Sequence, residues 1–409
     1  MATKADSVAA ADEKSVWAQP PASTESLLTE VSQPADAVVV GIGRLGLCFA
    51  LTLEAAAGLR VIGVDLNPTY ITLLNERKYR TTEPRVEEFL GKSKNFVATT
   101  DLAAAMANPA PLVFILVPTP TSGGRNFYDH AILGNVLQRI NEMKVANKHV
   151  IINATVMPGY INKTAKTLLR DCTNTTISYN PAFTAQGEIM EGYRTGGMFG
   201  MVLVGAENDA IFERLREIYL TIAGEVKVNV CRMSPESAEI CKLSSNCFRT
   251  TKISFANMVG DIADRTPGAD KFDICNALGM DASIGPKCIR PGYGYGGPCY
   301  PRDNRALAKY AESIGIEATI PIASDRYNEF HHDVMAAELL ERGDEAYTFD
   351  DVGYKPRLAV AMIDESPVLA VAARVAKAGK RVVIRDNKAK VMETMKEYGN
   401  MFEYEIIEE

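Results

Sequence analysis

The stretch that decides the fold is Ala37-Val38-Val39-Val40-Gly41-Ile42-Gly43-Arg44-Leu45-Gly46. It starts as a short apolar strand and continues at once into a GxGxxG motif, followed by a helical pattern over Leu47–Ala57. A second strand over Arg60–Val64 ends on Asp65, which follows the third glycine by about 20 residues. The order of strand, glycine motif, helix, strand and acidic residue predicts a βαβ unit that binds a dinucleotide.

Each glycine of the motif is needed for a different physical reason. Gly41 would make the tight turn, Gly43 would let a pyrophosphate approach the backbone, and Gly46 would let the helix pack closely on the strand. The helix N-terminus would carry the phosphates, and an acidic residue at position 65 would accept hydrogen bonds from a ribose diol, which favours NAD over NADP. We therefore expect NAD to contact Gly41, Ile42, Gly43, Arg44, Leu45, Gly46 and Asp65. The alternative is a structural βαβ turn without a cofactor.

The alternation of strands and helices continues beyond this unit. Apolar strands are predicted over Leu112–Val117, His149–Ala154, Thr176–Tyr179 and Met201–Val204. The first of them stops at Val117-Pro118-Thr119-Pro120, as expected of a parallel strand whose carboxyl end opens on a ligand crevice. Residues 35–230 are therefore predicted to form a doubly wound Rossmann-like domain of the α/β class.

Composition narrows the function classes. The 409-residue chain is 47% hydrophobic with a net charge of −7, which predicts several globular domains and argues against a nucleic-acid partner. Its 8 cysteines form no CxxC pair and only 4 histidines are present, so we expect reduced thiols, a cytoplasmic location and no metal site. Residues 1–34 are typical of a disordered leader without a signal peptide. No apolar run of membrane-spanning length occurs, so no membrane insertion is expected.

The pattern turns helical from Ser234 to about Arg265, and residues 231–330 are predicted to form a central helical domain. Lys242 and Asn246 are spaced i, i+4 on this long helix, so both can face one cleft. A solvated helix lysine is the alternative for Lys242. A helix of this length also suggests a homodimer or higher homo-oligomer.

The glycine-dense loop Gly292-Tyr293-Gly294-Tyr295-Gly296-Gly297-Pro298-Cys299-Tyr300-Pro301-Arg302-Asp303 delivers one cysteine and then an aspartate. Cys299 in this setting is predicted to be a nucleophile, because Arg302 and the N-terminus of a helix over residues 303–313 would favour its thiolate. The alternative is a cysteine buried in a Gly/Pro turn.

Several motifs occur together in an order that resembles the UDP-glucose/GDP-mannose dehydrogenase family, with the UDP-glucose 6-dehydrogenase branch nearest. Besides the first glycine motif, they are Val117–Pro120, Thr155-Val156-Met157-Pro158-Gly159, Lys242–Phe248, Lys252–Asn257 and Gly296–Leu307. The echoes Val352-Gly353-Tyr354-Lys355-Pro356 and Glu365-Ser366-Pro367, with a helix over Val368–Lys377 and a strand over Arg381–Ile384, suggest a partial second nucleotide-binding domain over residues 331–409. The resemblance thus implies two Rossmann-like domains joined by a long central helix, the C-terminal one truncated.

The family implies an NAD-dependent, four-electron oxidation of a nucleotide-sugar primary alcohol to a carboxylate, with UDP-glucose as the expected substrate. By this resemblance Cys299 would form a thiohemiacetal and then a thioester, and Lys242 would stabilise oxyanion charge. Asn246 and Asp303 would hold water and the reacting groups. Thr155 would lie by the nicotinamide, with Val117, Pro118, Thr119 and Arg302 also on the cofactor side. Substrate contacts are implied for Asn180, Phe183, Lys242, Asn246, Cys288, Ile289, Arg290, Pro291, Gly292 and Gly296.

The chain also departs from the family pattern. Ala182 and Gln186 replace two family glutamates, of which the first is the expected base for thioester hydrolysis, while Glu188 and Glu191 lie nearby. Further departures are Ser283 in place of an arginine that reaches a neighbouring subunit, Pro298 in place of a serine, and Asp364 in place of a ligand-contacting arginine. Three hypotheses therefore stay open: a nucleotide-sugar 6-dehydrogenase, a dehydrogenase of the same ancestry acting on another alcohol, and a catalytically silent homologue.

Overall fold

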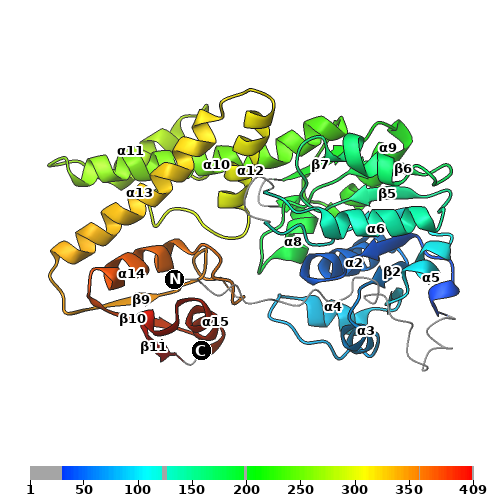
Figure 1. The fold of residues 1–409 in the computed structure, drawn as a ribbon, viewed down its shortest axis with the longest axis horizontal. Coiled ribbons are helices and arrows are strands. Elements are labelled where there is room, and N and C mark those ends of the chain that lie inside the picture. The colour runs from blue at the N-terminus through cyan, green and yellow to red at the C-terminus, as the bar shows by residue number, and fades with distance from the viewer. Residues whose placement is uncertain (1–29, 122–126, 198–199, 359, 408–409) are drawn as a thin grey trace, which may run out of the picture.

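The computed structural model of the chain describes residues 30–121, 127–197, 200–358 and 360–407. Figure 1 shows three parts: a large sheet domain, a layer of long helices beside it, and a small sheet domain that lies below the helices. The helical layer joins the two sheet domains in space as it does in the sequence.

The large domain is built on one eight-stranded sheet. Its strands lie in the order β3-β2-β1-β4-β5-β6-β7-β8, and they pair in parallel except for an antiparallel contact between β6 and β7. The strands are β1 (Ala37–Val40), β2 (Val61–Val64), β3 (Phe96–Thr99), β4 (Leu112–Ile115), β5 (His149–Ile152), β6 (Thr176–Tyr179), β7 (Met201–Gly205) and β8 (Asn229–Met233). The predicted doubly wound sheet is confirmed, although the sequence analysis missed β3 and β8.

Both faces of this sheet are covered. Ala37 and Val39 of β1 belong to one apolar core, whereas Val38 and Val40 belong to the other, because successive side chains of a strand point to opposite faces. A continuous apolar strand is therefore the pattern that a parallel sheet with two covered faces needs. The covering helices are α2 (Arg44–Ala57), α3 (Pro68–Asn75), α4 (Val86–Lys92), α5 (Leu102–Ala107), α6 (Ala131–Glu142), the π-helix η2 (Ile161–Ala165), α7 (Lys166–Leu168), α8 (Ile189–Thr195) and α9 (Asp209–Ala223).

The helical layer begins where the sheet ends. Ser234 caps the first helix by accepting a hydrogen bond from the Ser237 amide, and a proline occupies the first helical position. The four helices are α10 (Pro235–Asp264), α11 (Lys271–Met280), α12 (Tyr300–Ser313) and α13 (Thr319–Glu341). The predicted domain boundaries at 230/231 and 330/331 fall inside β8 and α13, so neither coincides with the end of a secondary-structure element.

The C-terminal domain is a small parallel sheet with the strand order β11-β10-β9. Its elements are β9 (Ala346–Asp350), α14 (Pro367–Lys377), β10 (Arg381–Asp386), α15 (Lys388–Tyr398), the 3-10 helix η4 (Gly399–Met401) and β11 (Glu403–Ile406). The predicted helix over Val368–Lys377 and strand over Arg381–Ile384 both form, within one residue at the start of the helix and two at the end of the strand. This is the partial Rossmann-like unit that the resemblance implies.

The leader predicted for residues 1–34 needs correction at its end. Val31 is buried in the core of the large domain, and the Asn108 side chain donates hydrogen bonds to the carbonyl oxygens of Val31 and Gln33. Residues 30–34 therefore belong to the folded domain. The rest of the predicted leader lies outside the described residues.

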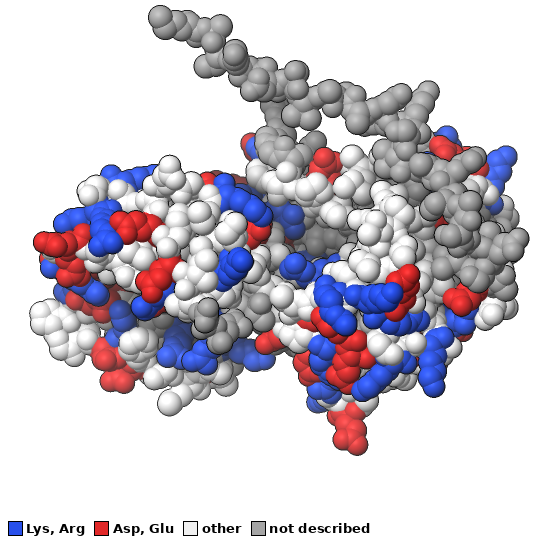
Figure 2. Space-filling view, turned by 90° about the horizontal axis from the view of Figure 1, so that it is seen from below, with Lys and Arg blue, Asp and Glu red and all other residues white. Residues whose placement is uncertain are grey.

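Among the described helices, none combines the length and apolarity needed to cross a membrane. Seen from below, the molecule shows two lobes with a hollow between them, and Lys and Arg side chains lie on its margin (Figure 2). The large domain forms one lobe, and the helical layer with the small domain forms the other.

Candidate active site

The glycine motif has the geometry that a dinucleotide needs. Gly41 adopts a positive φ of 86°, and a Cβ on Gly46 would lie 2.0 Å from the Gly41 carbonyl oxygen. A Cβ on Gly43 would meet nothing within 4 Å, so the backbone is open to a ligand at that point. No side chain caps the N-terminus of α2, so its first amide groups are available to phosphate oxygens. The residues at this turn therefore fit the pyrophosphate of NAD.

Asp65 lies directly after β2, at the same edge of the sheet as the glycine turn. The Asn67 amide donates to its Oδ1 at 3.3 Å, and the side chain is half-buried. This weak local contact leaves its carboxylate able to accept from a ribose diol.

The ends of β4 and β5 converge with the start of α12. The Thr119 hydroxyl donates to the Thr155 carbonyl oxygen at 2.8 Å, and Arg302 Nη1 donates to the Thr119 carbonyl oxygen at 3.2 Å. Val117 is buried and Pro118 exposed at this sheet edge. Thr119 and Thr155, which were predicted to lie by the cofactor, are thus brought together with Arg302 of the cysteine loop.

Cys299 is the N-cap residue of α12, which begins at Tyr300, three residues before the predicted start, and Cys299 is exposed. Its pKa is nevertheless raised above the ordinary value, first because burial removes water from the sulfur and next because the Asp303 carboxylate is near. Lys242 and Arg302 lower the pKa but do not outweigh these two effects. Arg302 thus acts on the thiol in the predicted direction, but desolvation and Asp303 prevail in the free protein.

Asp303 is buried, and donors from two other elements hold its two carboxylate oxygens. Asn246 Nδ2 donates to Oδ2 at 2.7 Å, and the Tyr128 hydroxyl donates to Oδ1. Arg249 Nη1 donates to Asn246 Oδ1 at 3.0 Å, which fixes the orientation of the Asn246 amide. Burial raises the pKa of Asp303, while Lys242, these hydrogen bonds and Arg302 lower it.

Lys242 lies on α10 one turn before Asn246, as the i, i+4 spacing predicts, and it is buried rather than solvated. Its Nζ donates to the Ala182 carbonyl oxygen at 3.0 Å and lies 4.5 Å from the centre of the Phe183 ring. Lys242 and Phe183 thus meet at the loop that follows β6. The lysine is an ammonium with two further donors for a ligand oxygen.

The loop predicted to cradle the substrate is held by α10 and α13. Asn257 Oδ1 accepts from the Gly292 amide at 2.8 Å, and a His331 ring nitrogen contacts the Gly292 carbonyl oxygen at 2.6 Å. Within it Ile289 is buried, Arg290 lies over the Phe272 ring, Pro291 contacts Gly260, and Cys288 has a positive φ of 64°. These contacts give the loop one defined conformation.

Gly296 packs against the C-terminal domain rather than leaving space for a ligand. A Cβ on this residue would lie 2.0 Å from the carbonyl oxygen of Glu365. The adjacent Gly297 donates its amide hydrogen to the Asp364 carbonyl oxygen at 2.8 Å. Gly296 therefore makes an interdomain contact, and the substrate contact implied for it stays a prediction.

Asn180 also departs from its predicted role. Its side chain is buried, where Nδ2 donates to the Leu203 carbonyl oxygen and Oδ1 accepts from Asn153 and from the Tyr219 hydroxyl. These hydrogen bonds use the amide within the sheet domain. Its predicted substrate contact is corrected to a structural role for the side chain.

The neutral residues Ala182 and Gln186 stand where the family pattern has two glutamates. Ala182 presents its carbonyl oxygen to Lys242, and Gln186 Oε1 accepts from Arg44 of the glycine motif at 3.1 Å. Glu191, which the sequence offers nearby, forms an ion pair with Arg194. The carboxylate that holds this loop is Glu83, which accepts from the amides of Gly187 and Ile189.

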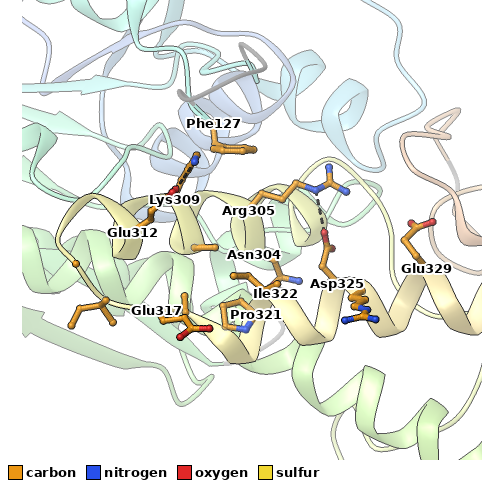
Figure 3. A pocket seen from close by; sticks show the side chains of 15 residues that line it. Phe127, Asn304, Arg305, Lys309, Glu312, Glu317, Pro321, Ile322, Asp325 and Glu329 are labelled. Atoms are coloured by element: carbon orange, nitrogen blue, oxygen red, sulfur yellow. Dashed lines mark hydrogen bonds and ion pairs between the residues drawn. The ribbon is translucent and has the colours of Figure 1, made fainter.

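A cavity of about 780 Å³ lies between α12 and α13 and does not include Cys299. Figure 3 shows Arg305 of α12 turned towards Asp325 of α13, with Asn304 and Pro321 at the same cavity. Asn304 follows Asp303 directly, so the lining of the cavity adjoins the candidate active site along α12. Within the described part of the chain, no His, Cys, Asp and Glu side chains cluster in a way that would hold a metal ion.

The sequence analysis missed Tyr128, Arg249 and Glu83. Tyr128 and Glu83 lie outside every motif quoted above, and they reach the site through contacts between distant segments. The spacing of Arg249, one turn beyond Asn246 on the same helix, was the one signal that could have revealed it.

Comparison with known proteins agrees with this geometry. A family model described as the NAD binding domain of the UDP-glucose/GDP-mannose dehydrogenase family matches residues 35–223, and the central domain of the same family matches residues 236–330. The structure of a UDP-glucose dehydrogenase from Pyrobaculum islandicum is 27% identical with a TM-score of 0.79, covering 92% of this chain and 87% of that one.

Curated relatives fall into two substrate groups. GDP-mannose 6-dehydrogenase of Pseudomonas aeruginosa is 28% identical over 68% of this chain, and UDP-glucose 6-dehydrogenase TuaD of Bacillus subtilis is 29% identical over 69%. The matches span 65% and 61% of the length of these two relatives.

Proposed function

The chain belongs to the UDP-glucose/GDP-mannose dehydrogenase family, and from this premise we propose that it oxidises the 6-hydroxymethyl group of a nucleotide sugar to a carboxylate. The observation that carries the proposal is the meeting of Cys299, Asp303, Lys242 and Asn246 on two packed helices beside a glycine motif that fits NAD.

Bound NAD would accept one hydride in each of two successive oxidations, held by the glycine turn, Asp65 and the ends of β4 and β5. The balance is one primary alcohol, two NAD⁺ and one water giving one carboxylate, two NADH and three protons. The protein's own residues must therefore retain the aldehyde between the two oxidations and accept protons.

Cys299 retains the aldehyde in this proposal. Its sulfur adds to the aldehyde carbon as a thiohemiacetal, and the second oxidation leaves a thioester on the same sulfur. Since the pKa of the free thiol is raised, the attack requires a proton acceptor, and Asp303 is the carboxylate beside it. Lys242 would donate a hydrogen bond to the oxygen on which negative charge develops.

Water then hydrolyses the thioester and releases the carboxylic acid and the Cys299 thiol. No carboxylate stands at positions 182 and 186, so we propose that Asp303 is the proton acceptor in this step as well. Its burial, which raises the pKa, makes it a stronger base than an exposed aspartate.

UDP-glucose is the substrate that we propose, because the solved structure with a TM-score of 0.79 is a UDP-glucose dehydrogenase. GDP-mannose is the second candidate, since five curated relatives are GDP-mannose 6-dehydrogenases. The same fold could also serve another alcohol, and the neutral residues Ala182 and Gln186 favour that alternative.

We also propose that the protein is a homodimer through its helical layer. Phe248, Phe255 and Ile262 of α10 recur at every seventh position and are 68%, 47% and 59% exposed. Exposed apolar side chains also occur on the neighbouring helices; they are Phe272, Met280, Ile320, Ile322 and Phe330. Exposed apolar patches are typical of protein interfaces, and sedimentation of a monomer at micromolar concentration would contradict the proposal.

The test of the function is the number of NADH molecules formed per molecule of sugar nucleotide consumed. Purified protein is supplied with NAD and, separately, with UDP-glucose, GDP-mannose, UDP-amino sugars and free alcohols. Two NADH per UDP-glucose is the expected result. One NADH per substrate would mean that oxidation stops at the aldehyde, and NAD binding without turnover would favour a catalytically silent homologue.

A further inference from the structure

A buried tyrosine outside the sequence motifs contacts the catalytic aspartate. Tyr128 lies between β4 and α6, is 2% exposed, and packs in a small apolar cluster with Leu243 of α10 and Ala306 of α12. The cluster therefore contains side chains of both the sheet domain and the helical layer. Tyr128 is the member of this cluster that carries a polar group to Asp303.

The direction of the hydrogen bond between Tyr128 and Asp303 is fixed by chemistry. Burial and the neighbouring carboxylate hold the pKa of the Tyr128 phenol well above its ordinary value, so it remains protonated at any working pH. The hydroxyl must then be the donor and the Asp303 carboxylate the acceptor. Asn246 supplies the donor to the other oxygen, so the carboxylate is held from both sides.

The tyrosine ring is held on the side of the cofactor site. The Arg302 guanidinium lies over the ring at 4.4 Å from its centre, and its Nη1 donates to the Thr119 carbonyl oxygen. Thr119 in turn donates to Thr155. The contacts of Tyr128 thus run from the end of β4 to the carboxylate beside Cys299.

We propose that Tyr128 is a positioning residue of the reaction, which holds the Asp303 carboxylate in one orientation beside Cys299 through the hydrogen bond to Oδ1. The inference rests on the proposed function, because it assigns Tyr128 a part in that reaction. Tyr128 itself touches neither the thiol nor a substrate atom in this proposal; it acts through Asp303.

The hydrogen bond has a measurable consequence at the thiol. Asp303 loses one of its two side-chain donors when the hydroxyl is removed, so its carboxylate is protonated more readily. The carboxylate, which the proposed reaction needs in its ionised form, then faces Cys299 without the offsetting dipole of the hydroxyl, so it opposes ionisation of the thiol more strongly. The groups whose charge acts on the thiol or that lie near it are Asp303, Arg302, Lys242, Tyr128, Tyr300 and Tyr354. The three phenols have raised pKa values and remain neutral, which leaves Asp303 as the group that responds.

The experiment is the pH dependence of Cys299 alkylation by iodoacetamide in the full-length protein, with Cys299→Ser as the blank for the other cysteines. We expect Tyr128→Phe to move the midpoint to higher pH by roughly half a unit to one unit. In steady-state kinetics the same variant should lose about tenfold in kcat while both KM values change less than about twofold. An alkylation profile and a kcat equal to those of the unmodified protein would overturn the proposal.

Two control variants distinguish the loss of Asp303 positioning from a general loss of structure. Tyr160→Phe also deletes a buried tyrosine hydroxyl in the large domain, but that hydroxyl has no hydrogen-bond partner among the residues that the structure describes, so alkylation and kcat should not change. In the Asp303→Asn background, Tyr128→Phe should move the alkylation midpoint no further, and an additive shift would overturn the proposal. If Tyr128→Phe fails to fold, Tyr128→Met serves the same comparison.

The alkylation assay needs no turnover, so it distinguishes the two proposals. If no nucleotide sugar is oxidised but the midpoint shifts as expected, the proposed function fails while the contact of Tyr128 with Asp303 and Cys299 stands. If turnover gives two NADH per substrate and the midpoint does not move, the function stands and the role of Tyr128 is overturned.

Discussion

The molecule contains two βαβ units, β1-α2-β2 and β9-α14-β10, and they end differently. Both second strands lead to an aspartate, Asp65 in the first unit and Asp386 in the second. Asp65 is half-buried with one weak backbone contact, whereas Asp386 is buried, accepts from the Val352 amide at 2.9 Å and lies 3.3 Å from Lys390 Nζ. The Asp65 carboxylate is therefore available to a ligand, whereas the Asp386 carboxylate is engaged by groups of its own domain.

The two units also differ in the connection between the first strand and the helix. The first helix follows its strand after the short glycine turn and has no side-chain cap. In the second unit the long segment from Asp351 to Ser366 intervenes, and Ser366 caps α14. This segment reaches the cysteine loop and α12: the Asp364 carbonyl oxygen accepts from the Gly297 amide, and Glu365 forms a bidentate pair with Arg305. One unit is thus shaped for a cofactor, and the other supports the loop that carries Cys299.

The largest effect is expected at the cysteine loop, where the regions that contain the two units meet. Cys299→Ser removes the sulfur that retains the aldehyde, so formation of the acid should fall by about a thousandfold or more. A first oxidation that yields NADH and free aldehyde can persist. The measurement is NADH per sugar nucleotide together with the acid formed, and Cys172→Ser, in the sheet domain, is the matched control. Full four-electron turnover in Cys299→Ser would remove the covalent role.

The first unit can be tested alone by its glycines. A Cβ on Gly46 would lie 2.0 Å from the backbone oxygen of Gly41, so Gly46→Ala must distort the turn that fits the pyrophosphate. We expect the Kd for NAD to rise by about a hundredfold, measured by calorimetry. In Gly91→Ala of α4 the new methyl group would meet nothing within 4 Å, and the Kd should not change. An unchanged Kd in Gly46→Ala would place the cofactor elsewhere.

Sequence patterns predicted the parts of the site that are local in the chain. The glycine turn with Asp65, the pair Lys242 and Asn246, and the pair Cys299 and Asp303 each lie within one short segment or on one helix, so spacing alone brings them together. The same holds for six of the eight strands of the large sheet, because an apolar run buried on both faces is visible in a short window, whereas β3 and β8 were missed.

Contacts between distant segments could not be predicted in this way. Tyr128 lies 175 residues from Asp303, and Glu83 lies 104 residues from Gly187, and no local pattern encodes either contact. The direction of the Cys299 pKa shift escaped prediction for a related reason. It depends on how much water the packed chain removes from the sulfur, whereas the sequence shows only the nearby arginine.

The supporting role of the second unit predicts a smaller effect. Glu365→Gln breaks the bidentate pair with Arg305 and leaves the glycine turn untouched. We expect kcat to fall about threefold while the Kd for NAD stays the same, because a partly exposed ion pair contributes little free energy. Glu403→Gln breaks a similar bidentate pair, with Arg381, inside the small sheet, and should leave kcat unchanged. An equal loss in both variants would mean that the domain as a whole, not the contact at the loop, affects turnover.

The smallest expected effect is on stability. The stability of the large sheet should depend on pH through a buried histidine, and that of the small sheet should not. His149 of β5 is buried, and desolvation lowers its pKa to about 4, whereas the strands of the small sheet contain no histidine. The folded protein keeps this imidazole neutral down to about pH 4, while the unfolded chain binds a proton near pH 6.5. Between these values the unfolded state holds more protons, so the free energy of unfolding decreases as the pH falls from 6.5 to 4.

His149→Gln should therefore reduce the slope of stability against pH near pH 5 by about one proton, or ~1.4 kcal/mol per pH unit. The measurement is hydrogen exchange in increasing urea, corrected for the intrinsic exchange rate, in peptides that cover β5 and β10. The slope should change for β5 and not for β10, because the small sheet can lose its structure without protonating His149. An unchanged slope for β5 would mean that His149 is not held neutral in the folded domain. An equal change in both peptides would mean that the two sheets unfold as one cooperative unit, so that the two βαβ units differ in their ligand contacts but not in their stability.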